Sequence, residues 1–569
     1  MRTLLMPEFL KKIRFHPRLV THLKGYQAAD LRADLAAGVT VGIVALPLAI
    51  AFGIASGARP EHGIVTAIVA GFLISALGGS RVQIGGPAGA FVALLYAIVE
   101  RYGIANLLIA TSMAGVLLFA MGAFRMGNLV RFVPVSIIIG FTAGIAVIIG
   151  LSQVKDFLGL PIDKMPSNFF SQLKAIGAAI SHINLAALII GASSLALIAI
   201  WPVSSKSYPK RWQRIAVRFP STLVVLVVWG FAVKMFELPV ETIGTRFGEL
   251  PRGLPMPTVP TFDWETAQNL VAPTLAIALL GAIESLLCAR VADGMIDDRH
   301  DPNQELMAQG VANFFTPFFG GIAATGTIAR TVTNVKSGAR TPVAGIVHAI
   351  TLLLIVLAAA PFAVHIPLAA LAAVLVWVAI NMGDWAEFAR LRQYSVFYRS
   401  TLLVTFCLTV VFDLVVAVEV GLVLASLFFI YRISSLTRVD DIELPYDRSQ
   451  VEGGAVRAYR VYGALFFGAV NKVEFLLDPA RALPKVLILD LEKLINLDTT
   501  GMDALDGVLS RAKKCGTRMI ITGVNEQPLS LMQRSGFLTR LGEANRFSSF
   551  DDALYDLDVW LDAAASEEL

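Results

Sequence analysis

Residues 320–330 read Gly-Gly-Ile-Ala-Ala-Thr-Gly-Thr-Ile-Ala-Arg, a glycine-rich break inside the apolar stretch that runs from Leu306 to Val335. A second break, Gly-Gly-Pro-Ala-Gly-Ala at 85–90, opens the third apolar stretch of the chain. Short apolar segments interrupted by Gly or Pro at matching positions of two halves are typical of transporters built from inverted repeats. The two breaks therefore predict a helical membrane protein whose binding site lies where helices are interrupted.

The composition agrees with a bilayer environment. The 569 residues are 56% hydrophobic and 16% charged, with a mean hydropathy of +0.68, whereas soluble chains carry about 25% charged residues. The three cysteines have no metal-ligand spacing, and no phosphate-binding loop indicates ATP-driven transport. We expect a lipid bilayer as partner, no cofactor, no nucleic acid and no enzymatic activity, because the sequence has no nucleophile–base constellation.

The domain boundaries follow from changes in composition along the chain. Residues 1–35 are expected to form a cytoplasmic N-terminal segment, and residues 36–435 the transmembrane transport domain. A polar linker is expected at 436–450. Residues 451–569 alternate strand-like and helix-like patterns, which predicts a small cytoplasmic α/β domain.

Basic residues predict the orientation. If the N-terminus is cytoplasmic, cation-rich loops such as 206–218, 290–299 and 432–438 all fall on the cytoplasmic side, as the positive-inside rule requires. Both termini are therefore expected in the cytoplasm.

Three residues in or beside apolar stretches stand out. Pro47 lies in the middle of the first stretch, where it removes a backbone hydrogen bond and kinks the helix. Glu284 is an ionisable group among apolar residues, so it is expected either to pair with Arg330 or to bind a proton or cation coupled to transport. Arg330 is expected either to supply positive potential for an anion or to extend its side chain to the cytoplasmic interface.

Several stretches resemble the SulP family of anion transporters. They are residues 37–42, 45–49, 82–87, 281–294, 303–313 and 318–340. The run Arg-Thr-Val-Thr-Asn-Val at 330–335 is especially specific, and residues 281–289 and 293–295 look closest to the bacterial C4-dicarboxylate type. The tail is similar to a STAS domain, whose characteristic turn matches Asp498, Thr499, Thr500 and Gly501.

The resemblance implies fourteen spans as two inverted seven-span repeats, divided into core and gate domains, usually as a homodimer in a bacterial inner membrane. It places the anion between the facing N-termini of the third and tenth spans, near Pro47 and Glu284. The positions of this chain at those N-termini are Pro87, Ala88, Gly89, Ala90, Gly326, Thr327 and Ile328.

The expected function is proton-coupled uptake of C4-dicarboxylates such as succinate, fumarate or aspartate, and the alternative is transport of bicarbonate or sulfate. Sodium-coupled relatives have Asp and Thr where this chain has Glu284 and Cys288. Because an apolar environment disfavours an ionised carboxylate, coupling to protons is expected rather than to sodium. Hypotheses of other classes are an anion channel, a nucleobase permease and a STAS signalling module on a membrane anchor.

The STAS turn has two interpretations. Asp498 is expected to cap the helix that follows it. The same turn could instead bind a nucleotide or a regulatory partner, or accept phosphate on Thr499 or Thr500.

Overall fold

The computed structural model describes residues 15–128, 134–201, 220–249, 253–259, 264–412, 414–444, 456–478 and 480–567. The chain divides into two compact units, Met1–Leu422 and Val423–Leu569. The predicted cationic loop at 206–218 lies outside the described residues, as do residues 1–14 of the predicted N-terminal segment and 445–450 of the predicted linker.

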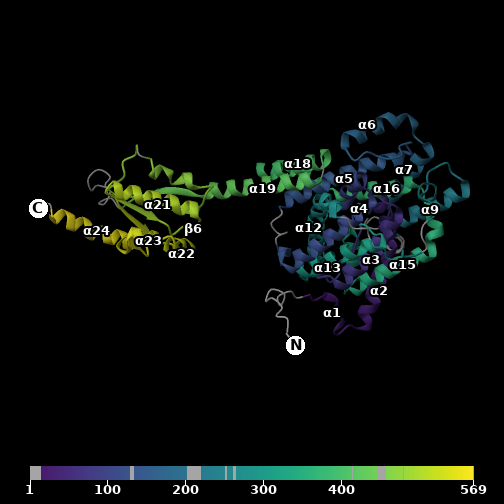
Figure 1. The fold of residues 1–569 in the computed structure, drawn as a ribbon, viewed down its shortest axis with the longest axis horizontal. Helices are drawn as coiled ribbons and strands as arrows, with labels where there is room; N and C mark the ends of the chain where they lie inside the picture. Colours follow the sequence, from purple (N-terminus) through teal and green to yellow (C-terminus); the bar gives the residue numbers. More distant parts are fainter. Residues whose placement is uncertain are drawn as a thin grey trace. The chain divides into compact units, whose positions relative to one another are not determined.

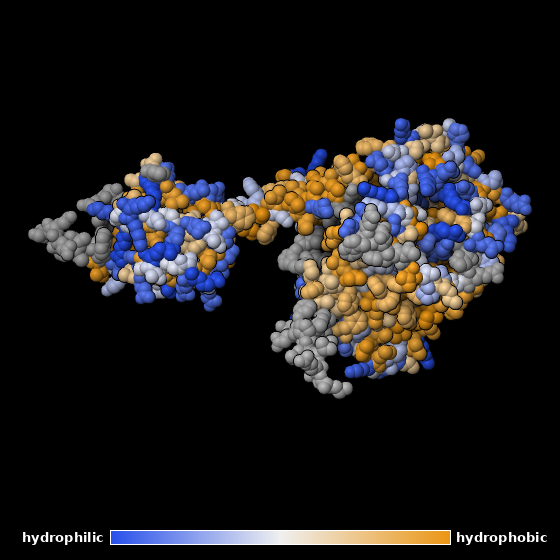
Figure 2. Space-filling view, in the orientation of Figure 1, coloured by the Kyte–Doolittle hydropathy of each residue, from blue (hydrophilic) through white to orange (hydrophobic). Residues whose placement is uncertain are grey.

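The larger unit is built from helices, most of them apolar. They are α2 (Ala28–Ala55), α3 (Pro60–Leu77), α4 (Gly89–Ala123), α5 (Val135–Leu158), α6 (Phe169–Ala179), α7 (Leu185–Ile200), α9 (Ser221–Phe236), α12 (Val271–Ile296), α13 (Pro302–Phe315), α14 (Ile328–Lys336), α15 (Val343–Ala363), α16 (Leu368–Met382) and α18 (Val396–Val411), followed by α19 (Leu414–Leu436). Among the described residues, six helices are long and apolar enough to span a membrane, or seven if the bent α6–α7 pair counts as one span. Hydrophobic residues cover much of the face of this unit seen in Figure 2.

These helices form two groups. Helices α2, α3, α4, α12, α13, α14 and α15 pack against one another, and α5, α7, α9, α16 and α18 form a second packed set (Figure 1). Contacts of α16 with α2 and of α4 with α5 join the two sets. We call them the core group and the gate group, following the division that the resemblance implies.

The predicted helix breaks are confirmed. Helix α13 ends at Phe315, a short 3-10 turn follows, and α14 begins only at Ile328. Gly320 lies between them with φ 78°, a conformation that favours glycine. The first long helix differs from the prediction, because α2 begins at Ala28 and therefore extends into the segment assigned to 1–35.

Close backbone contact between α4 and α13 depends on small residues. A Cβ atom built on Gly310 would lie 2.4 Å from the backbone nitrogen of Phe119, and one built on Gly115 would lie 2.4 Å from that of Phe314. Small residues at such positions let membrane helices approach closely. The glycines therefore let α4, which begins at Gly89 beside the first helix break, pack closely against α13.

Replacing Gly310 with alanine is expected to destabilise the protein by about 2 kcal/mol or more, because the backbones of α4 and α13 must move apart. Gly294 of α12 is the matched control, since a Cβ atom there meets nothing within 4 Å, and Gly294→Ala should be neutral or stabilising. Thermal unfolding of both variants in detergent checks this. Equal stability of the two would contradict the packing argument.

The smaller unit contains a sheet with helices on both faces. The strands are β3 (Arg438–Ile442), β4 (Val456–Leu465), β5 (Val486–Asp490), β6 (Leu494–Leu497), β7 (Arg518–Thr522) and β8 (Arg546–Phe547), in the order β3-β4-β5-β7-β8 with β6 beside β4. Alternate residues of β5 face opposite cores. Leu487 and Leu489 pack in the core that includes α21 (Thr499–Lys514), whereas Val486 and Ile488 pack in the core that includes α24 (Phe550–Glu567).

Strand β3 corrects the predicted linker. Residues Arg438–Ile442 lie within 436–450, yet they pair antiparallel with β4, with Asp440 opposite Arg460. The charges of this segment indicated a polar linker. An edge strand tolerates such charges because one of its sides pairs with no other strand.

Candidate functional site

The two sequence breaks meet in space. Strand β1 (Gly85–Gly86) pairs antiparallel with β2 (Thr325–Gly326), so that Gly85 lies opposite Gly326 and Gly86 opposite Thr325. The pairing continues at Thr327, whose backbone nitrogen and side-chain hydroxyl both donate to the carbonyl oxygen of Ile84 at 2.9 Å. Two segments more than two hundred residues apart in the sequence therefore form one small ribbon inside the core group.

Each strand leads into a helix whose first turn has no side-chain cap. Ala88 precedes α4, Thr327 precedes α14, and neither side chain accepts a hydrogen bond from its helix. Pro87, Ala88, Gly89, Ala90, Gly326 and Thr327 are buried, and Ile328 is half-buried. Unpaired N–H groups and the positive end of the helix dipole favour an anion at such a start. The structure thus brings the predicted binding residues of the two halves into one region.

A polar network supports the ribbon from α12. The Ser285 hydroxyl lies 2.7 Å from that of Thr325 and accepts from the backbone nitrogen of Gly326 at 3.3 Å. Gln83 donates to the Ser285 carbonyl at 3.2 Å, and Cys288 donates from Sγ to the Thr331 hydroxyl at 3.2 Å. Each of these side chains is buried, so the hydrogen bonds hold β2 and the start of α14 in place.

Arg330 is the cation of the site. Its side chain is 1% exposed, so it does not extend to the cytoplasmic interface. Nη2 donates to the carbonyl oxygen of Pro87 at 3.2 Å, which ties α14 to the segment before α4. Nη1 is buried and has no hydrogen-bond partner among the described residues. A Cβ atom on Gly86 would lie 2.5 Å from Nη1, so glycine leaves the room that the guanidinium needs.

Glu284 lies on α12 immediately before Ser285. Its side chain is 6% exposed, and it forms neither an ion pair with Arg330 nor a hydrogen bond with any other part of the chain that the structure describes. The structure therefore does not support the first of the two interpretations of Glu284, a structural pair with Arg330. A nearly buried carboxyl group without a partner is costly when ionised, and its interpretation as a proton or cation site stays a prediction.

Pro47 lies inside α2, as predicted, and is buried, but it borders a different space. It lines an apolar cavity of about 470 Å³ together with residues of α9 and α15. A second cavity, of about 760 Å³, lies among α4, α5, α6 and α19 and is lined by Glu100, Arg101 and Glu419 among others. Neither cavity includes the predicted residues at the starts of α4 and α14.

The prediction missed several side chains around the two helix starts. Beside Gly89, Phe52 of α2 and Met382 of α16 lie 3.3–3.4 Å from the position that a Cβ atom would take. Ser285, Thr325 and Gln83 were missed as well. Ser285 directly follows Glu284, so its position next to an intramembrane carboxylate could have indicated a role. Phe52 and Met382 could not be found in this way, because they resemble any other apolar residue of a membrane helix.

Comparison with known proteins identifies the family. The model of the sulfate permease family matches residues 31–405, and that of the STAS domain matches residues 449–553. The chain belongs to the sulfate permease (SulP) family. It is therefore an anion transporter of the membrane rather than an enzyme, and the smaller unit contains its STAS domain.

Relatives of this SulP chain match it along most of its length. It is 41% identical to the Bacillus subtilis (strain 168) protein named "Putative sulfate transporter YvdB", over 94% of this chain and 99% of that one. It is 29% identical to the bicarbonate transporter BicA of Picosynechococcus, over 92% and 94% of the two chains. The structure of murine Slc26a9 in the inward-facing state has the same fold, with a TM-score of 0.85 at 18% identity, over 98% of this chain and 96% of that one.

The STAS turn caps a helix, as the first interpretation predicted. One oxygen of Asp498 accepts from the backbone nitrogen of Gly501 at 2.8 Å, and the other accepts from that of Phe467 at 3.2 Å. Thr499 and Thr500 are exposed in the first turn of α21. Their modification and any nucleotide at this turn stay predictions.

Replacing Asp498 with alanine is expected to cost the STAS domain about 1–2 kcal/mol, because an N-cap and a loop contact are lost together. Asparagine at this position retains the cap. Hydrogen exchange of the full-length chain at Gly501 and Phe467 is expected to become about tenfold faster in Asp498→Ala and to change little in Asp498→Asn. Unchanged exchange in the alanine variant would refute the capping role.

Proposed function

We propose that this chain is a secondary transporter that carries a small inorganic oxoanion, with sulfate as the first candidate and bicarbonate as the second. The observation that carries the proposal is Arg330, a buried guanidinium beside the segment that opens α4, one of whose nitrogens has no partner among the described residues. A buried charge is unfavourable until a counter-charge joins it. An anion between the starts of α4 and α14 supplies that counter-charge.

The choice of anion rests on the relatives. Backbone N–H groups and a guanidinium attract negative charge but distinguish the shapes of anions poorly. The names of the relatives refer to sulfate and bicarbonate and give the expected C4-dicarboxylates no support. We therefore place sulfate first, because the relative with 41% identity carries that name, and keep succinate as a comparison substrate.

Coupling to protons through Glu284 is the second part of the proposal. A carboxyl group that is 6% exposed and lacks a partner in the described structure loses much less on burial when it is protonated. Sodium-coupled relatives have a threonine hydroxyl where this chain has the thiol of Cys288. That thiol already donates a hydrogen bond to Thr331. Both features favour a proton over sodium.

The proposed architecture is fourteen spans in two inverted repeats. Helix α4, whose helical conformation is broken at Gly103, then counts as two spans, and α2 corresponds to α12 as α4 corresponds to α14. The antiparallel pairing of β1 with β2 agrees with such a relation between the halves. A homodimer in a bacterial inner membrane, with both termini cytoplasmic and a regulatory partner at the STAS domain, completes the proposal.

Uptake into proteoliposomes tests the proposed function. Labelled sulfate, bicarbonate and succinate are offered separately, each with and without an inward proton gradient. We expect saturable sulfate uptake that the gradient accelerates. Bicarbonate uptake alone would replace the first candidate by the second, and succinate uptake alone would restore the C4-dicarboxylates. Flux without saturation would favour a channel, and no flux of any anion would refute the proposal.

A further inference from the structure

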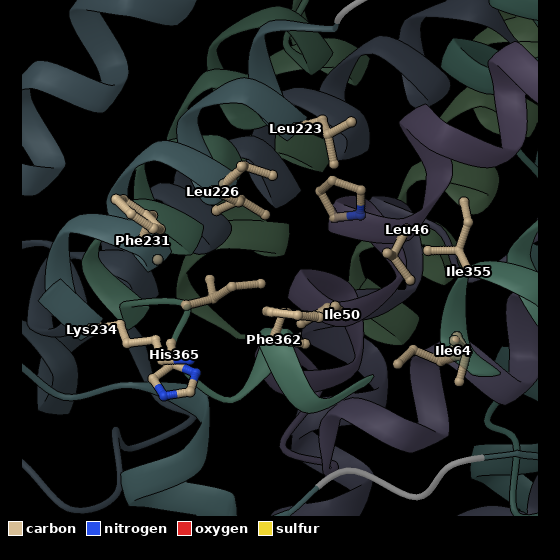
Figure 3. A pocket seen from close by; sticks show the side chains of 16 residues that line it. Leu46, Ile50, Ile64, Leu223, Leu226, Phe231, Lys234, Ile355, Phe362 and His365 are labelled. Atoms are coloured by element: carbon tan, nitrogen blue, oxygen red, sulfur yellow. The ribbon is translucent and has the colours of Figure 1, made fainter. Parts of the chain in front are cut away.

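The apolar cavity beside Pro47 is lined by helices of both the core group and the gate group. Leu46 and Ile50 of α2 and Ile355 of α15 form one wall, and Leu223 and Leu226 of α9 form the other. Figure 3 shows these side chains around the open space. Its volume of about 470 Å³ lies within the range of about 300–1,000 Å³ that small-molecule pockets occupy.

One side of this cavity carries a cation, the Lys234 ammonium, and an imidazole, that of His365. Lys234 and His365 both line it, and Figure 3 places them on the same side in the view, away from Leu46 and Ile355. The Lys234 ammonium lies 5.9 Å from the centre of the Phe362 ring and forms no ion pair among the described residues. Nδ1 of His365 is buried and has no hydrogen-bond partner in the described part of the chain. An apolar wall and an unpaired cation thus adjoin the same space.

We propose that this cavity binds a fatty acid from the surrounding bilayer, a single alkyl chain that ends in a carboxylate. The chain fits the apolar walls, and the carboxylate faces Lys234 and His365. Lipid tails are as apolar as the leucines of the wall, so an alkyl chain gains little by leaving them. The charge of the head group must therefore decide which amphiphile binds.

The position of the cavity gives binding a consequence. Its walls belong to both helix groups, and Pro47, a predicted neighbour of the anion site, lies in the wall formed by α2. A chain that fills the space contacts both groups and resists a displacement of one against the other. The fatty acid is therefore an inhibitor of transport. This consequence rests on the proposed function, whereas binding itself does not.

Equilibrium binding of labelled dodecanoate to the full-length protein in a neutral detergent tests the site. Dodecanol and dodecylammonium have the same chain and serve as competitors. We expect dodecanoate to bind saturably and the two competitors to displace it poorly. Lys234→Gln should weaken binding about tenfold, the effect of losing one charge-assisted hydrogen bond, and Lys234→Arg should restore it. Equal competition by dodecylammonium, or unchanged binding to Lys234→Gln, would overturn the proposal.

A second variant fills the space itself. Gly230 lines the cavity, and a Cβ atom there meets its nearest neighbour, Cγ1 of Ile366, at an ordinary contact distance of 3.7 Å, so leucine is expected to add its bulk to this space. Gly230→Leu should lose dodecanoate binding. Gly177→Leu is the control, because Gly177 has nothing within 4 Å and does not line the cavity. Retained binding in Gly230→Leu would contradict the assigned site.

Transport gives a separate readout. Dodecanoate should slow sulfate uptake by the natural chain at least severalfold and leave uptake by Gly230→Leu unchanged. If the natural chain transports no anion, the proposed function is wrong. The binding experiment still tests whether the cavity binds a fatty acid. If dodecanoate binds and uptake continues at full rate, the inhibitory consequence is wrong.

Discussion

Arg330→Gln is expected to lower the affinity for the transported anion about 10- to 100-fold. The guanidinium is 1% exposed, donates from Nη2 to the Pro87 carbonyl, and has no partner for Nη1 among the described residues. A hydrogen bond to a charged group contributes about 1.5–3 kcal/mol, and each 1.4 kcal/mol is a factor of ten. The rate of sulfate uptake is measured as a function of sulfate concentration, and the loss of affinity should appear as a higher half-saturation concentration.

Two variants separate this effect from a loss of structure. Arg330→Lys keeps a positive charge but not the fork of donors, so it should recover part of the affinity. Arg340 is an exposed arginine whose ion pair with Asp30 measures 3.0 Å, and Arg340→Gln should leave the affinity unchanged. Equal losses in Arg330→Gln and Arg340→Gln would refute a specific role for Arg330.

Glu284→Gln is expected to abolish the acceleration of uptake by an inward proton gradient. Glutamine has the shape of the protonated carboxyl group but cannot release a proton. Because Glu284 has no ion pair among the described residues, its replacement leaves no charged partner behind, and folding should be little affected. The measurement compares the rate of uptake into proteoliposomes with a pH gradient to the rate without one. The ratio of the two rates should fall to about one in Glu284→Gln.

Glu284→Asp is the matched control for proton coupling. It retains a titratable group on the same face of α12 and should keep a gradient dependence, with a lower rate because the carboxyl group is displaced by one methylene. A gradient effect that persists in Glu284→Gln would assign the coupling to another residue.

The positions of the helix breaks could be predicted from the sequence, but their pairing could not. Gly85–Gly86 and Gly320–Gly321 interrupt apolar runs, and glycine signals a break wherever it lies in such a run. The register of Gly85 opposite Gly326 depends on how two distant segments pack. Hydropathy carries no information on that packing, since a side chain that faces lipid and one that faces another helix are equally apolar.

The same limit applied to single residues of the site. Arg330 follows the second break, and sequence alone left open whether it is buried or extends to the interface. The Arg330 side chain can be buried because Gly86 leaves space for the guanidinium and the carbonyl oxygen of Pro87 accepts a hydrogen bond from it. Both belong to the other half of the chain.

The STAS domain was more predictable because its sequence alternates between residues of two cores. Leu487 and Leu489 alternate with Val486 and Ile488 between two cores, and a buried strand of a parallel sheet has this continuous apolar pattern. Strand β3 was missed because its charged residues lie at the edge of the sheet, where burial does not select apolar side chains.

An experimental structure determined with selenate, a sulfate analogue whose selenium scatters anomalously, tests the central claim most directly. The account predicts an anomalous peak between the starts of α4 and α14, within hydrogen-bond distance of Arg330 and of backbone N–H groups at Ala90 or Ile328. A peak found only in the cavity lined by Glu100 and Arg101, with none beside Arg330, would contradict it.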